Sequence, residues 1–269
     1  MKRGIPPIIA CLLAGCVVAG GFVDAGAAQS GRGTIKGHIR LTGKLPGNPV
    51  IRMGADPMCS RMNAGKRVVQ ESVAATADGS LANVFVKLQG SFPQTPVPAQ
   101  PVTIDQRGCI YGPRVVGVRQ GQVLQVRNDD ALLHNVHGVS ASNNGFNVGQ
   151  PMAGMVNKFT LKSEEIMLRL RCDIHSWMTA FVGIVAHPYF AVSNASGTFE
   201  IVDVPVGRHT IGTWHERYGP LKQTVQVTAG ATATVDLIYT GTEKPPTAGI
   251  RDVSVPAGVL TAQFVAPER

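Results

Sequence analysis

The 269-residue sequence lacks any segment with a sustained helical period beyond its apolar N-terminus, and only 6% of its residues are aromatic. Glycine and proline, by contrast, are plentiful, at 31 and 18 residues. Short runs of valine, isoleucine and threonine recur between these turn-forming residues, which is typical of β-strands. The sequence therefore predicts an all-β fold, and its length indicates about two domains.

Motifs of several functional classes are missing as well. The formal net charge is +8, but the basic residues are scattered and no RNA- or DNA-binding motif accompanies them. We expect no nucleic-acid partner, and interpret the charge as solvated surface or as a docking face for an acidic redox partner or an anionic membrane. The chain has no Cys-x-x-Cys-His haem site, and Trp214-His215-Glu216 lacks the His-Glu-x-x-His pattern of zinc hydrolases. We expect a structural or interdomain role for that run, and no enzyme activity.

The N-terminus has the pattern of an export signal over residues 1–28, with a basic start and an apolar run from Ile5 to Val23. Two cleavage sites compete. Leu13-Ala-Gly-Cys16 matches a bacterial lipobox, which would leave Cys16 lipidated, whereas cleavage after Ala28 would release a soluble protein. Both place the folded part outside the cytoplasm. We expect a periplasmic protein, soluble or lipid-anchored, that meets the membrane only through an anchor at Cys16.

The strongest functional signal is the loop Cys172-Asp-Ile-His175-Ser-Trp-Met178, which joins predicted strands over 165–171 and 179–185. Its thiol, imidazole and thioether are three of the four ligands of a blue-copper electron-transfer centre. A second histidine is available in the run Leu133-His134-Asn135-Val136-His137. Residues three apart on a strand point to opposite faces, so one of these histidines reaches a given metal. His134, which follows the turn at 128–130, is the better candidate.

Other metal sites use some of the same residues. A structural zinc site is the main alternative, with ligands at His134, His137, Cys172 and His175. Strand geometry argues against the use of both upstream histidines, and zinc leaves Met178 without a role. Two further methionines are rival axial ligands on chemistry alone, although apolar packing is the preferred interpretation for both: Met152 and Met155.

His-Asn-Val-His upstream of Cys-x2-His-x2-Met resembles the copper site of the amicyanin and plastocyanin group of cupredoxins, and the loop spacing is similar to amicyanin in particular. The resemblance implies a cupredoxin-like Greek-key sandwich or barrel that carries single electrons on one type 1 copper ion. It implies four ligands: His134, Cys172, His175 and Met178. The backbone amide of Asn135 is then expected to bond the cysteine sulfur. The edge of His175, with Trp177 nearby, is the expected electron exit.

A second resemblance covers residues 188–241. The pattern Gly-x-Phe-x-Ile-x-x-Val-Pro-x-Gly, ending at Gly207, resembles the carboxypeptidase regulatory-like, transthyretin-like β-sandwich. His209 stands where that family usually has an aromatic residue. We therefore expect a cupredoxin-like domain with an N-terminal extension over 33–187, an accessory sandwich over 188–241 and a tail over 242–269. Within the extension, residues 48–65 are expected to be irregular.

Only three cysteines follow the export signal, and an unpaired thiol in an oxidising compartment needs a reason such as metal binding. With Cys172 assigned to copper, we predict a disulfide between Cys59 and Cys109. Pairing of Cys172 with either partner is the alternative, and it would preclude copper binding.

The predicted function is electron carriage by an exported type 1 copper protein, between redox partners such as a cytochrome or a dehydrogenase. A copper storage or delivery protein, and an envelope binding module with a structural metal, are the alternatives. An oxidase or nitrite reductase is disfavoured, because those enzymes need further copper ligands.

Overall fold

The computed structural model describes Met1 and residues 31–243. The export signal predicted over 1–28, apart from Met1, and the tail from residue 244 lie outside the described residues. The described part contains two short helical segments, η1 (Met53–Ala55) and α1 (Pro57–Met62). Its strands are β1 (Arg32–Leu41), β2 (Phe85–Leu88), β3 (Val102–Gln106), β4 (Tyr111–Gly112), β5 (Val115–Arg119), β6 (Val123–Asn128), β7 (His134–Val139), β8 (Phe146–Gln150), β9 (Val156–Thr160), β10 (Glu165–Arg171), β11 (Thr179–Val185), β12 (Phe190–Val192), β13 (Thr198–Pro205), β14 (Gly207–Trp214), β15 (Lys222–Val227) and β16 (Thr232–Tyr239).

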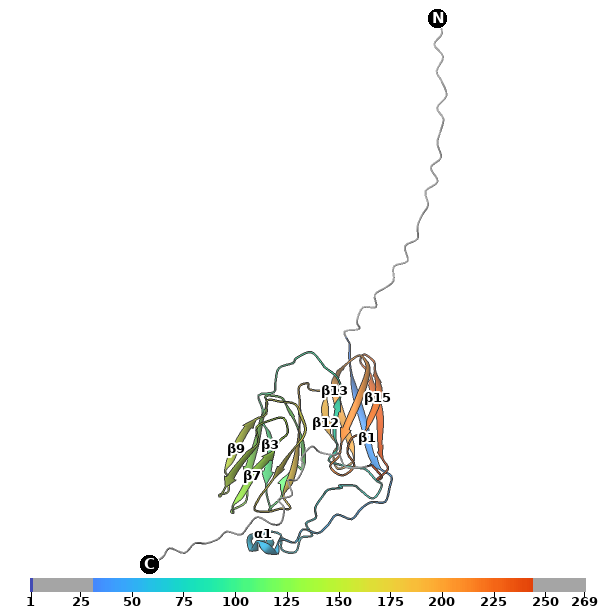
Figure 1. Ribbon diagram of the computed structural model, residues 1–269. Coiled ribbons are helices and arrows are strands. Elements are labelled where there is room, and N and C mark those ends of the chain that lie inside the picture. The colour runs from blue at the N-terminus through green and yellow to red at the C-terminus, as the bar shows by residue number, and fades with distance from the viewer. Residues whose placement is uncertain (2–30, 244–269) are drawn as a thin grey trace, which may run out of the picture.

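The strands form two sandwiches that stand side by side in Figure 1. The central sandwich pairs a five-stranded sheet, in the order β5-β11-β10-β7-β8, with a four-stranded sheet, β4-β3-β6-β9. The flanking sandwich pairs the sheet β13-β1-β16 with the sheet β12-β2-β14-β15. The predicted all-β class is confirmed. In the part of the chain that the structure describes, no helix has the length and apolar character needed to cross a membrane.

The two sandwiches do not divide the chain at residue 188 as expected. β1 pairs with β13 and β16, and β2 pairs with β12 and β14, so the first two strands belong to the flanking sandwich. The central sandwich therefore lies between β2 and β12 in the chain. The reason is burial: alternate residues of β1, such as Ile35 and Ile39, pack into one core with Val235 and Leu237 of β16.

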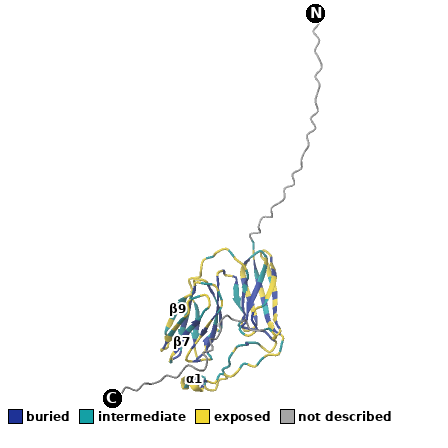
Figure 2. Cartoon of the chain, in the orientation of Figure 1, coloured by how far each residue is buried: buried dark blue, intermediate teal, exposed yellow. Residues whose placement is uncertain are grey.

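The core of the central sandwich lies between its two sheets, and Figure 2 colours the strands by how far their residues are buried. β6 contributes Leu124 and Val126, and β10 contributes Leu168 and Leu170; all four are fully buried. Period-2 alternation produces this arrangement, because every second residue of a strand points to the same face. The packed sheets give a rigid scaffold for the loops at their ends.

Candidate metal centre

Two segments of the five-stranded sheet bring the predicted ligands to one end of the central sandwich. β10 pairs with β7 on one side and with β11 on the other, and Arg171 lies opposite both His137 and Thr179. His134 at the start of β7 and the loop between β10 and β11 consequently lie next to each other. The predicted strands over 165–171 and 179–185 match β10 and β11 at both ends.

Three of the four predicted ligands converge there. Nδ1 of His134 lies 3.0 Å from Nδ1 of His175, and Sγ of Cys172 lies 3.7 Å from the same nitrogen of His175. The three donor atoms all lie within 4.8 Å of one another. His134, Cys172 and His175 are 0%, 2% and 1% exposed. The site is therefore closed to bulk water.

The sulfur of Cys172 is held in an environment that favours the thiolate. Burial by itself would raise the pKa of this thiol, but backbone amides and the His134 ring, which in its protonated form donates to the sulfur, lower the pKa to about 6. One of those amides is the N–H of Asn135, which donates to Sγ at 3.5 Å, as the resemblance implies. Because the thiolate is the form that binds metal, this environment prepares Cys172 as a ligand.

Each histidine is oriented by an aspartate on its outer side. Nε2 of His134 lies 3.0 Å from Oδ2 of Asp130, and Nε2 of His175 lies 3.0 Å from Oδ2 of Asp56. A carboxylate only accepts, so each Nε2 donates; in the neutral imidazole, the form that binds metal, each Nδ1 then turns a lone pair toward the centre of the site. Burial opposes the charged form of His134, but Asp130 and Cys172 raise its pKa. Two lone pairs facing each other beside a thiolate fit a bound cation.

The remaining predicted residues lie around this cluster. Met178 is buried, its N–H donates to the carbonyl of His175 at 2.9 Å, and its own carbonyl accepts from the N–H of Cys172. These bonds close the ligand loop; the axial role of Met178 stays a prediction. His137 points away from the cluster and pairs with Asp173 at 2.9 Å. The rival Met152 is 64% exposed, so its side chain does not contribute to the buried cluster.

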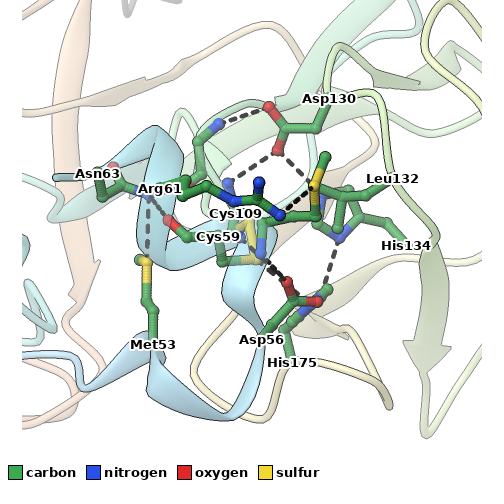
Figure 3. The surroundings of a disulfide bond; sticks show 12 residues. Met53, Asp56, Cys59, Arg61, Asn63, Cys109, Asp130, Leu132, His134 and His175 are labelled. Atoms are coloured by element: carbon green, nitrogen blue, oxygen red, sulfur yellow. Dashed lines mark hydrogen bonds and ion pairs between the residues drawn. A yellow bond between two sulfur atoms is a disulfide. The ribbon is translucent and has the colours of Figure 1, made fainter.

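The predicted disulfide between Cys59 and Cys109 is confirmed, and Cys172 is the free cysteine of the described residues. Figure 3 shows the disulfide beside the two histidines. Sγ of Cys59 lies 3.4 Å from Nε2 of His175, and the indole N–H of Trp177 donates to the carbonyl of Cys109 at 2.8 Å. The outer edge of His175 is thus covered. The N-terminal extension packs over this edge, and its role as the electron exit stays a prediction.

Sequence reasoning misses both aspartates and the helix that carries one of them. Residues 48–65, expected to be irregular, contain η1 and α1. A helix of six residues is too short to show a period. Its signal is the pair Asp56-Pro57, since Asp56 caps the helix and proline occupies the first helical position. The second missed signal is the four-residue spacing of Asp130 and His134.

No protein-family model matches the sequence, and no curated protein matches it. Among solved structures, the chain is similar to a copper-containing nitrite reductase from Thermus scotoductus (18% identity, 34% of this chain and 25% of that chain, TM-score 0.30). It is also similar to a purple cupredoxin from Nitrosopumilus maritimus (18% identity, 31% of this chain and 98% of that chain, TM-score 0.27). A methionine-to-alanine mutant of amicyanin with Cu(I) matches at 18% identity, over 37% of this chain and 97% of that chain, with a TM-score of 0.29. The chain thus spans a quarter of the nitrite reductase and nearly all of the two smaller proteins.

Proposed function

We propose that the protein binds one copper ion in a type 1 centre and carries single electrons. The ligands are His134, Cys172 and His175, with Met178 as the weak axial ligand. The observation that carries the proposal is the convergence of two imidazole Nδ1 atoms and one cysteine sulfur within 4.8 Å, in a closed site. This set of donors is that of a blue-copper centre.

The chemistry of the donors fits copper better than zinc. The zinc alternative needs His137 as its fourth ligand, and that side chain is turned outward onto Asp173. A soft thiolate with two imidazoles suits copper, which supplies one-electron exchange between Cu(I) and Cu(II) when bound. The protein's own part is to hold the three donors in fixed positions and to exclude water. Fixed ligands keep the rearrangement on electron transfer small.

Burial also favours electron carriage over copper storage or delivery. Handing copper to another molecule requires access to the ligands, and all three are nearly inaccessible. We expect the copper-loaded protein to cycle reversibly at an electrode and to exchange electrons quickly with a cytochrome or a dehydrogenase. In the same preparation, a competing chelator should remove copper slowly. Rapid loss of copper to the chelator together with sluggish cycling would favour delivery instead.

The location and the partner are parts of the same proposal. A disulfide such as Cys59–Cys109 persists in an oxidising compartment, which supports a periplasmic protein, either soluble or anchored through Cys16. A net charge of +8 suits docking on an acidic redox protein. The flanking sandwich, which resembles the transthyretin-like family over residues 188–241, is proposed as an accessory module without catalytic function.

Copper titration with spectroscopy tests the proposal directly. The apo-protein, given one equivalent of Cu(II), should turn intensely blue and show a narrow copper hyperfine splitting in its EPR spectrum. Cys172→Ser should abolish the colour, because the thiolate is the ligand responsible for it. His137→Ala is the matched control and should keep the colour, since His137 lies outside the cluster. A colourless protein that prefers zinc would refute the type 1 assignment.

A further inference from the structure

A segment of the N-terminal extension covers the candidate copper site at His175. This segment, Met53–Asn63, contains η1 and α1, and we call it the cap. It meets the imidazole at two points: Asp56 Oδ2 lies 3.0 Å from Nε2, and Cys59 Sγ lies 3.4 Å from the same nitrogen. His175 is 1% exposed as a result, although it lies in a loop (Figure 3).

The carboxylate of Asp56 is itself held in place. Its Oδ1 accepts from the backbone N–H of Met58 at 2.8 Å and from that of Cys59 at 3.1 Å, so the residue is the N-cap of α1. The helix is tied to the central sandwich by the Cys59–Cys109 disulfide. A side-chain N–H of Asn63 adds a bond to the carbonyl of Gly108 at 2.9 Å. These contacts leave Oδ2 directed at His175.

The other end of the disulfide has a matching arrangement. Asp130 accepts from the backbone N–H of Gly108 at 2.7 Å and from that of Cys109 at 2.8 Å. Its Oδ2 also accepts from Nε2 of His134 at 3.0 Å. Each cysteine of the disulfide therefore donates its backbone N–H to an aspartate, and each aspartate binds one of the two histidines. Cross-linking the chain does not by itself require this arrangement, which indicates a role at the metal centre.

We infer that Asp56 is a positioning residue for His175, and that the disulfide keeps Asp56 in place. The inference rests on the proposed copper site. By accepting the Nε2–H bond, Asp56 selects the tautomer whose Nδ1 lone pair faces the metal position. Its negative charge strengthens the imidazole as a donor, which stabilises Cu(II) more than Cu(I) and lowers the reduction potential.

Asp56→Asn tests this role while keeping a residue that caps helices well. We expect Cu(II) affinity to fall roughly 10–100-fold, the usual effect of removing such a carboxylate. Cu(I) affinity should change less, so the reduction potential should rise, by about 59 mV for each tenfold difference. Chelator competition and voltammetry measure the two quantities. Asp236→Asn, which removes an exposed carboxylate on β16, should leave both unchanged.

A second measurement does not depend on copper. Nitrogen NMR of the apo-protein should show His175 protonated at Nε2, and Asp56→Ala should give a mixture of tautomers. The double variant Cys59→Ala, Cys109→Ala should weaken Cu(II) binding and raise the potential, because the cap loses its covalent anchor. If that variant keeps the Cu(II) affinity and the reduction potential of the wild-type protein, the disulfide does not keep Asp56 in place.

The outcomes separate this inference from the proposed function. If wild-type protein binds copper in a blue centre and Asp56→Asn has the same affinity and potential, Asp56 does not position His175 and the proposed function stands. An unchanged tautomer in Asp56→Ala would lead to the same conclusion. If the wild-type protein forms no blue copper centre, the proposed function fails and the inference fails with it.

Discussion

At the scale of single residues, His215 combines deep burial with a fixed neutral form. It is 1% exposed, and its Nδ1 accepts from the backbone N–H groups of Arg217 and Tyr218 at 3.2 and 3.3 Å. Burial, together with the positive charges of Arg114 and Arg217, lowers the pKa of His215 to about 4, from an ordinary 6.5. A proton on Nδ1 would break both hydrogen bonds.

This histidine predicts a loss of stability in mild acid. Between pH 6.5 and pH 4 the unfolded chain binds a proton at this position and the folded chain does not, so the free energy of unfolding falls as pH falls. The full difference corresponds to about 3 kcal/mol. His215→Asn keeps a hydrogen-bond acceptor and does not titrate, so urea unfolding at several pH values should show a shallower decline. An equal decline in both proteins would contradict the assignment.

At the scale of elements, two neighbouring strands each have a glycine where the sandwiches meet. Gly117 of β5 lies opposite Gly183 of β11 in the parallel ladder. The ring of Phe85 from β2 rests on Gly183, where a Cβ would lie 2.6 Å from its Cζ, and the rings of Phe190 and Phe85 cover Gly117. Phe85 is 1% exposed and belongs to a cluster with Val115 and Trp214. The absence of two side chains thus lets the sandwiches pack closely.

Gly183→Ala should destabilise the protein because the new methyl group overlaps the buried ring of Phe85. Overpacking of this kind costs about 1–3 kcal/mol. Gly149→Ala on β8 is the matched control, since a Cβ there meets no atom within 4 Å, and its effect should stay within about 0.5 kcal/mol. Urea denaturation measures both. Equal stability of the two variants would show that Phe85 does not pack tightly on β11.

At the scale of the whole molecule, the order of the chain and the order of the sandwiches differ. The flanking sandwich is built from both ends of the described chain, and the central sandwich is inserted between β2 and β12. A charged contact joins the two at their interface: Arg114 makes two bonds to Glu216, at 2.6 and 2.8 Å, with both side chains mostly buried. A bidentate pair of this kind fixes orientation as well as distance. Glu216 thus has an interdomain contact, in the run for which the sequence indicates such a role.

The sequence alone determined the features that depend on residues close together in the chain. The candidate ligand loop from Cys172 to Met178 is one of them, because three potential ligands at fixed spacing between two strands must lie close together in space. The strands β10 and β11 follow from local patterns of four to eight residues. The disulfide follows from a count of three cysteines, one of which the loop assigns to metal.

Only the tertiary structure decided what depends on distant pairings. β1 is parallel to β16 near the other end of the described chain, and a period-2 pattern says which face of a strand is buried but not which strand lies beside it. Asp56 and His175 are 119 residues apart, and their contact exists because the disulfide and the packing of α1 bring the extension onto the ligand loop. Local sequence specifies the candidate donors of the site. Long-range packing decides which carboxylates orient them and which surface is covered.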